Sequence, residues 1–258
     1  MTPLEAFLAS HWYLPAMAVM LVAGFAHGTM GFGFPLISTP MVALMTDIQT
    51  AVLASLFPNL AVNVVSIVRG GNWRASIARY WPVAAYVFIG TIVGTRVLLL
   101  ADPEPLKLLL AAIIVVYLLQ ARLRGIDWSW LARNPRASAA AFGLLAGFLQ
   151  GTVNVTVPPL VIYFMALGLD ALAMTQIMNL CFFVGRVTQA ATFGAAGHVD
   201  TAMLIATAPL TIAALAALVA GLALQQRIPR GRFQALLRAA LWVMALILAG
   251  QVVGHYLH

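Results

Sequence analysis

Charged residues are scarce in this sequence of 258 residues, of which 8% are charged and 63% are hydrophobic. A soluble globular domain has about 25% charged residues, so this chain has too little polar surface to cover a water-soluble globule. The mean hydropathy of +0.98 leads to the same conclusion. We therefore expect lipid to surround most of the chain.

The long apolar runs also lack the two-residue alternation that is typical of barrel strands. Within lipid, only helices and closed barrels satisfy all the hydrogen-bonding groups of the backbone. The sequence therefore predicts an all-α, polytopic helical membrane protein with a single transmembrane domain over residues 1–258.

Residues and motifs that support common enzyme chemistries are missing. The single cysteine, Cys181, lies in an apolar run and excludes an internal disulfide, and Glu5 and Glu104 are the only glutamates. We find no zinc-protease His-Glu-x-x-His motif, no Gly-x-Ser-x-Gly, no phosphate-binding loop and no cluster at metal-ligand spacing. We expect no enzyme, cofactor or metal site, and no cleavable signal peptide, because residues 1–10 lack a basic segment.

Two short stretches, residues 24–35 and 147–159, interrupt apolar runs with glycine, proline and uncharged polar residues. Gly24, Gly28 and Pro35 of the first stretch recur 123 positions later, and the recurring residues are Gly147, Gly151 and Pro158. Broken helices at matching positions in two halves point to the binding site of a transporter, although loops between helices are the simpler interpretation. We expect a first repeat over residues 14–122 and a second over residues 135–256.

Each repeat is expected to contain a broken, re-entrant helix hairpin and about three full spans. In the first repeat, the apolar pieces from Pro15 to about Gly28 and from Pro35 to Met45 are short for a membrane core of about 30 Å. The alternative is one tilted full span followed by a shorter one. Asp47 and Asp170 are predicted to cap the helices that follow the two hairpins, with later spans over about 49–68, 77–100, 103–120, 171–194, 201–224 and up to 254.

If each half crosses the membrane three times, most of the basic residues fall in loops on one face of the membrane. Because cytoplasmic loops carry the excess of Lys and Arg, the richer face is predicted to be inside, with both termini outside and the repeats inverted. This pattern explains the net charge of +7 better than a nucleic-acid surface does. The inner face receives Arg69, Arg74, Arg79, Arg122, Arg124, Arg133, Arg136, Arg227, Arg230, Arg232 and Arg238, and the outer face receives Arg96 and Lys107 with Glu5, Asp47, Asp102, Glu104 and Asp200.

Inverted hairpins would bring the two breaks together near the middle of the membrane. The helices that begin after Pro35 and Pro158 would point their N-termini at a common space, and the positive end of a helix dipole favours an anion. Gly28, Gly31 and Gly33 would let the backbone approach a ligand closely.

Arg186 is the most informative single residue, because it lies deep in an apolar span with no acid in the neighbouring turns. Such a charge usually faces a cavity, and an anion-facing role is predicted; the alternatives are pairing with carbonyls at a helix C-terminus or a depth nearer the interface. His27, which is replaced by Gln150 in the second stretch, is the candidate for proton coupling, or is a neutral residue that holds the break together. Further candidates for substrate binding are Thr29, Gly151, Thr152, Asn154, Thr156, Asn59, Asn63, Asn179 and Gln189.

The two glycine-rich, proline-terminated breaks resemble those of the TauE/SafE family of sulfite exporters, from about Leu14 to Gly254. The first break, with Gly28, Gly31 and Gly33, is the better match. The second departs from it, because Asn154 and Thr156 stand where the first has glycines. The resemblance implies export of sulfite or a related sulfur-containing or organic anion, driven by protons, across a bacterial inner (plasma) membrane.

The sequence thus predicts a secondary transporter that exports a small anion by alternating access, with protons and the lipid bilayer as further partners and a homodimer as one possible assembly. A transition-metal cation transporter is the first alternative, although it would need acids or paired histidines in the middle of the membrane. A membrane scaffold that transports nothing is the second, and Arg186 argues against it.

Overall fold

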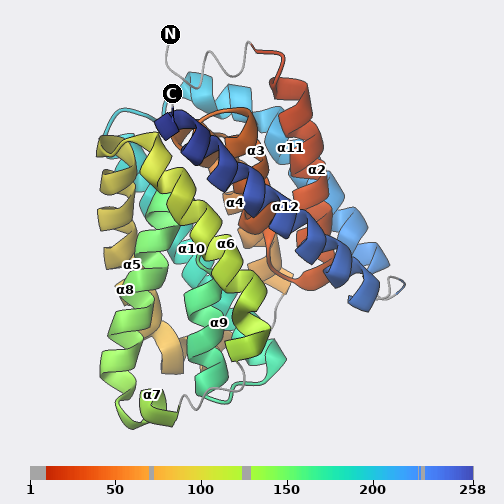
Figure 1. Cartoon of the computed structure of the whole chain (residues 1–258). Coiled ribbons are helices and arrows are strands. Elements are labelled where there is room, and N and C mark those ends of the chain that lie inside the picture. The colour runs from red at the N-terminus through yellow and green to blue at the C-terminus, as the bar shows by residue number, and fades with distance from the viewer. Residues whose placement is uncertain (1–9, 70–72, 124–128, 226, 228–229, 258) are drawn as a thin grey trace.

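The computed structural model describes residues 10–69, 73–123, 129–225, 227 and 230–257, and every regular element in those ranges is a helix. The helices form one bundle (Figure 1). The first half contains α2 (Tyr13–Met30), α3 (Phe34–Met45), α4 (Ile48–Arg69), α5 (Trp73–Leu100) and α6 (Pro103–Leu123). The second half contains α7 (Ser129–Arg133), α8 (Pro135–Val153), α9 (Val157–Ala166), α10 (Ala171–Ala195), α11 (Thr201–Leu224) and α12 (Arg230–Leu257).

Six of these helices are long and apolar enough to cross a membrane, and they lie in α2, α4, α5, α6, α11 and α12. The two short apolar helices are α3 and α9, which follow the two breaks. The chain is therefore a multi-pass helical membrane protein, as the sequence predicts, although α10, which is predicted from the sequence to be a full span, is not among the six.

The helices that precede the breaks are longer than the short pieces expected from the sequence. Helix α2 has 18 residues, which is about 27 Å at the rise of an α-helix, and α8 has 19. The length of α2 fits the alternative of a span followed by a shorter piece. The short helix α7 was not predicted, and Glu5 lies outside the described residues.

Both breaks begin with a residue in the left-handed conformation. Gly31 ends α2 with a φ of 81°, and Asn154, which is 123 positions later, ends α8 with a φ of 67°. Glycine adopts this conformation freely, and asparagine is one of the few other residues that tolerates it. Asn154 therefore departs from the glycine pattern in sequence while it keeps the same backbone geometry.

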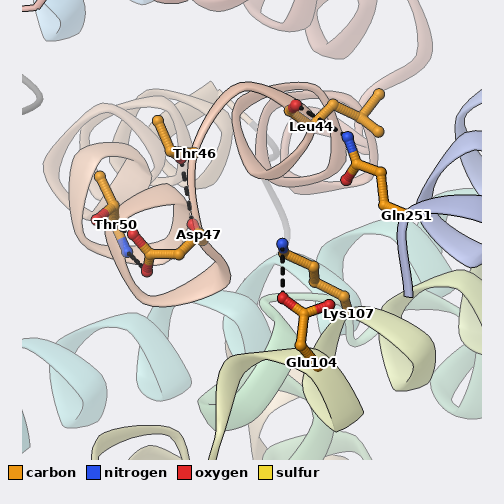
Figure 2. A network of polar contacts seen from close by, with 7 residues as sticks. All are labelled: Leu44, Thr46, Asp47, Thr50, Glu104, Lys107 and Gln251. Atoms are coloured by element: carbon orange, nitrogen blue, oxygen red, sulfur yellow. Dashed lines mark hydrogen bonds and ion pairs between the residues drawn. The ribbon is translucent and has the colours of Figure 1, made fainter. Parts of the chain in front are cut away.

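Acidic caps start three of the helices. Asp47 accepts hydrogen bonds from the Thr50 amide at 2.9 Å and from Thr50 Oγ1 at 2.6 Å (Figure 2). Asp170 and Asp200 accept bonds from free amides in the first turns of α10 and α11. The caps predicted at Asp47 and Asp170 are confirmed, and each satisfies amides that a helix start leaves without partners.

Two further contacts lie near the Asp47 cap (Figure 2). Lys107 and Glu104 form an ion pair of 3.0 Å in α6. Gln251 of α12 donates to the carbonyl of Leu44 at 3.3 Å, which joins α12 to the last turn of α3.

Glycines let two pairs of helices pack backbone to backbone. A Cβ atom at Gly24 of α2 would overlap the carbonyl oxygen of Ala214 in α11, and one at Gly147 of α8 would overlap that of Val87 in α5. Small residues at such contacts are the usual basis of helix packing in lipid. Gly90 and Gly94 of α5 likewise face the backbone of α8.

Equivalent helices exchange partners between the halves. Helix α2 packs against α11 and α8 against α5, while α4 contacts α10 and α6 contacts α12. Figure 1 shows the two glycine-packed pairs on opposite sides of the bundle, with the start of α2 and the end of α12 at the same end. This exchange is what a two-fold relation between the halves would produce, so it supports the repeat over residues 14–122 and 135–256, whose inverted topology stays a prediction.

Candidate functional site

Arg186 lies in the core of the bundle, where only 1% of its surface is exposed. Its Nη1 donates to Gln189 Oε1 at 2.7 Å and its Nη2 donates to the carbonyl of Asn154 at 3.2 Å. The Asn59 amide, oriented with its oxygen toward the guanidinium, accepts from Nε at 3.0 Å and from Nη2 at 2.9 Å. The side chain therefore points into the interior of the bundle.

All the acceptors around Arg186 are neutral amide or carbonyl oxygens. Within the described residues, the only ion pair joins Lys107 and Glu104 in α6. One acceptor, the Asn154 carbonyl, lies at the C-terminal end of α8, as the alternative interpretation anticipated. Neutral oxygens satisfy the N–H groups but leave the charge uncompensated, and an isolated charge in a low-dielectric interior is costly.

The second break is held by a network of side chains centred on Gln150 and Gln189. Gln189 Nε2 donates to the carbonyls of Gln150 at 3.1 Å and of Gly151 at 3.2 Å. The Gln150 carbonyl also accepts from the Asn154 amide that ends α8, at 3.2 Å. Gln150 donates to the Phe182 carbonyl at 3.0 Å and accepts from Thr156 Oγ1 at 3.0 Å. The break is thereby fastened to α10 beside Arg186.

Asn154 connects this network to the first half of the chain. Its Nδ2 donates to Thr39 Oγ1 in α3 at 2.7 Å, while its carbonyl accepts from Arg186. The second break therefore contacts the middle of the short helix that follows the first break, so that both halves contribute to the surroundings of Arg186.

The first break is held by His27, which is 1% exposed. The Phe34 amide, at the start of α3, donates to His27 Nδ1 at 3.4 Å, and Nε2 lies 2.9 Å from Ser66 Oγ. The Ser66 hydroxyl donates to the Val62 carbonyl at 2.8 Å. All three hydrogen bonds are satisfied if Nδ1 accepts from the Phe34 amide and Nε2 donates to the Ser66 hydroxyl. This is the pattern of a neutral imidazole.

A cavity of about 140 Å³ lies beside the first break, between α2, α4, α10 and α11. It brings together three predicted site residues, His27, Gly31 and Asn179. Arg186 does not line it. The other lining residues are Ser66, Ile67, Arg69, Leu172, Thr175, Gln176, Leu218 and Leu222.

Some predicted ligand contacts have a packing role in the structure. A Cβ at Gly28 would overlap the Leu218 carbonyl of α11, and one at Gly151 would crowd the backbone of α5. Gly33 has a φ of 109° at the start of α3, where it completes the turn. The hydroxyls of Thr29 and Thr152 donate to carbonyls of their own helices. These contacts explain the presence of the five residues at these positions without a bound ligand.

The helix N-termini after the breaks offer fewer amide donors than the sequence suggests. The Phe34 amide is already bonded to His27, and Pro35, Pro158 and Pro159 have no N–H group to donate.

Sequence reasoning missed Ser66, Arg69 and Thr39. Ser66 could have been predicted from the sequence, because Asn59, Asn63 and Ser66 are spaced by four and three residues and so share one face of α4. Thr39 has no such signal, because its contact with Asn154 joins residues 115 positions apart.

The comparisons with known proteins agree with this architecture. The model of the family described as sulfite exporter TauE/SafE matches residues 16–249, which is nearly the whole chain. No curated protein and no solved structure matches the chain. The extent of the family match, on a multi-pass helical bundle with two proline-bounded breaks, shows that this chain belongs to the TauE/SafE sulfite exporter family of membrane transporters.

Proposed function

We propose that this chain is a secondary transporter that exports sulfite or a related small sulfur-containing or organic anion. Membership of the TauE/SafE family supports transport of a sulfur-related anion across a membrane. The single observation that carries the proposal within the chain itself is the buried guanidinium of Arg186, which has neutral oxygens as its partners.

An anion beside Arg186 would provide the charge that the site lacks. Charges inside a membrane protein commonly mark substrate pathways, because their cost is otherwise hard to justify. Asn59 and Gln189 hold the guanidinium in place through neutral contacts, which orient it and leave its charge available. A small anion would form a pair with it and reduce the cost of keeping a charge in the core.

The exchange of helix partners between the halves supports alternating access. Transporters of this general plan rock one repeat against the other around a fixed site. The two breaks lie in the hairpins that would move, and Asn154, Thr39 and Arg186 connect them to the centre. The cavity beside the first break would be the access route to one side.

Proton coupling is proposed to act through His27. The imidazole accepts from the Phe34 amide in its neutral form, and a proton on Nδ1 would put two donors face to face. Protonation would therefore release the start of α3 from α2. The metal-transport alternative has less support, since no group of three or more His, Cys, Asp or Glu residues occurs in the described part of the chain.

The test is flux of radiolabelled sulfite in proteoliposomes that contain the Arg186→Gln variant. We expect the flux to fall at least 100-fold, because the variant keeps a polar side chain and loses the charge. The flux of the Arg186→Lys protein should lie between those of the wild-type and Arg186→Gln proteins, since a lysine keeps the charge without the planar set of donors of the guanidinium.

The matched control is Arg136→Gln, the same change at an exposed arginine at the start of α8. It should transport like the wild-type protein. Size-exclusion chromatography and the thermal unfolding midpoint establish that each variant is folded. Normal flux in a folded Arg186→Gln protein would remove Arg186 from the transport site.

A further inference from the structure

The cavity beside the first break combines aliphatic walls with a few uncharged polar groups and one cation. Ile67, Leu172, Leu218 and Leu222 form apolar wall, while Ser66 and Asn179 contribute polar groups. Arg69 lines the cavity and is exposed at the end of α4, so the cavity reaches the end of the bundle to which the crossing count assigns the excess of arginines. Asp170, the nearest acid along α10, is occupied by capping that helix.

A polar face on α4 runs from this cavity to Arg186. Ser66 lines the cavity and Asn59 binds the guanidinium, and Asn63 lies between them at one-turn spacing. On α10, Asn179 lines the cavity and Arg186 lies seven residues further along the same face. The two helices are in contact. These polar residues, which we call the polar track, thus follow one face of α4 and one face of α10 between the cavity and the charge.

Asn63 is the anomalous member of this track. It is 1% exposed, and neither its Nδ2 nor its Oδ1 has a hydrogen-bond partner. A buried amide without partners costs free energy, whereas an apolar residue of the same shape would not. In the same track, Asn179 Oδ1 also lacks a partner. The Asn63 amide and the Asn179 oxygen, on helices that contact each other, indicate a place where a ligand that both accepts and donates hydrogen bonds would complete them.

The position of Asn63 in the repeat strengthens this inference. It is 123 residues before Arg186, so the two residues occupy equivalent positions in α4 and α10. In the second half that position holds a charge, whose partners are all supplied by the protein. In the first half it holds a neutral amide beside a cavity.

We propose that the cavity is a second binding station for the transported anion, and that Asn63 transfers the anion between this station and Arg186. The proposal rests on the transport function proposed above. The station takes a small monovalent oxyanion that carries a hydroxyl, because Asn63 Nδ2 can donate to its oxygens while the oxygens of Asn63 and Asn179 can accept from its O–H. Arg69, the one charged side chain among the described residues of the lining, is at the mouth. The expected side of entry is the one that carries Arg69.

The first test is the Asn63→Leu variant in sulfite-flux assays, with the concentration of sulfite varied on the Arg69 side. Leucine has the same γ-branched shape as asparagine, although it is larger, and it leaves no unsatisfied group. We expect a thermal unfolding midpoint at or above that of the wild-type protein, together with at least a tenfold rise in KM. A purely structural Asn63 would give the opposite result, a lower midpoint with an unchanged KM.

The second test uses Arg69→Gln, which changes an exposed side chain and so does not depend on the folding of a core variant. We expect KM on the Arg69 side to rise three- to tenfold at low ionic strength, and the difference from the wild-type protein to shrink in high salt. Arg136→Gln, which removes the same charge away from the cavity, should leave KM unchanged.

The outcomes separate this proposal from the transport function. If the wild-type protein moves no sulfite or other small anion, the proposed function fails. If Arg186→Gln abolishes flux while Asn63→Leu and Arg69→Gln keep the wild-type KM, the function stands and the second station is wrong.

Discussion

The two buried residues that could carry a positive charge, Arg186 and His27, lie in different environments. Arg186 has donors only and is surrounded by oxygens from α4, α8 and α10. His27 has one nitrogen accepting from a backbone amide and the other facing a hydroxyl. The environment of Arg186 holds a charged guanidinium in place. The environment of His27 favours a neutral ring, because a proton on Nδ1 would break the bond from the Phe34 amide. We therefore propose anion attraction for Arg186 and any proton-driven movement for His27.

Replacing His27 by glutamine tests the proposed proton coupling. Gln150 occupies the equivalent position in the second break and bonds across it, so a glutamine at position 27 should fold and keep the break closed. It does not titrate. We expect the His27→Gln protein to transport sulfite down its concentration gradient, with an imposed pH gradient changing its initial rate less than twofold.

The control for this prediction is His198→Gln, the same change at an exposed histidine in the turn before α11. That variant should respond to the pH gradient as the wild-type protein does. If His27→Gln also keeps the full response, the coupled proton is carried by another group or by the anion itself.

At the residue scale, the sequence predicted which side chains are buried and polar better than it predicted their partners. Arg186 stands out because a charge in an apolar run is rare, and Gln189 lies three positions later on the same helix face. Asn59 and Asn154 come from other helices, and only the folded bundle places them beside the guanidinium. Long-range contacts of this kind leave no local signal in one sequence.

At the element scale, the packing of α2 on α11 and of α8 on α5 depends on glycines. The sequence marks Gly24, Gly28, Gly147 and Gly151 as unusual, but it does not distinguish a glycine that admits a ligand from one that admits another helix. The structure assigns all four to helix contacts. The bounds of the spans and the caps at Asp47 and Asp170 were predictable, because hydrophobic length and capping residues are local properties.

Adding one methyl group at Gly147 tests the importance of this packing. The new Cβ would overlap the Val87 carbonyl and approach the Thr91 amide, and backbone atoms cannot move aside without separating the helices. We expect Gly147→Ala to lose about 1–3 kcal/mol of stability, the usual cost of overpacking. The measurement is the thermal unfolding midpoint in detergent, which should fall by several degrees.

Gly250→Ala is the matched control, because a Cβ at that helical position meets nothing within 4 Å. Its midpoint should equal or exceed that of the wild-type protein, as alanine favours helix more than glycine does. Equal losses in the two variants would mean that the α5–α8 contact is not closely packed.

At the scale of the whole molecule, the distribution of charge predicts inverted repeats, and the exchange of helix partners is compatible with them. The Asp47 cap and the Glu104–Lys107 ion pair, both assigned to the outer face by the crossing count, lie near each other in the structure (Figure 2). Arg69 lies at the opposite end of α4 from Asp47. An odd number of crossings in each half would place the equivalent starts of α2 and α8 on opposite faces of the membrane.

Cysteine labelling of those two equivalent starts tests the inverted topology. The buried Cys181 is first replaced by serine, and Trp12→Cys or Arg136→Cys is then added, both at exposed positions beside α2 and α8. A membrane-impermeant maleimide applied to intact spheroplasts should label the Trp12→Cys protein, because the start of α2 is predicted to lie outside. The Arg136→Cys protein should be labelled only after the membrane is permeabilised, because the arginine-rich face is predicted to be inside. Labelling of both from the outside would make the repeats parallel, and the two breaks would then enter from the same face, which removes the basis for alternating access around Arg186.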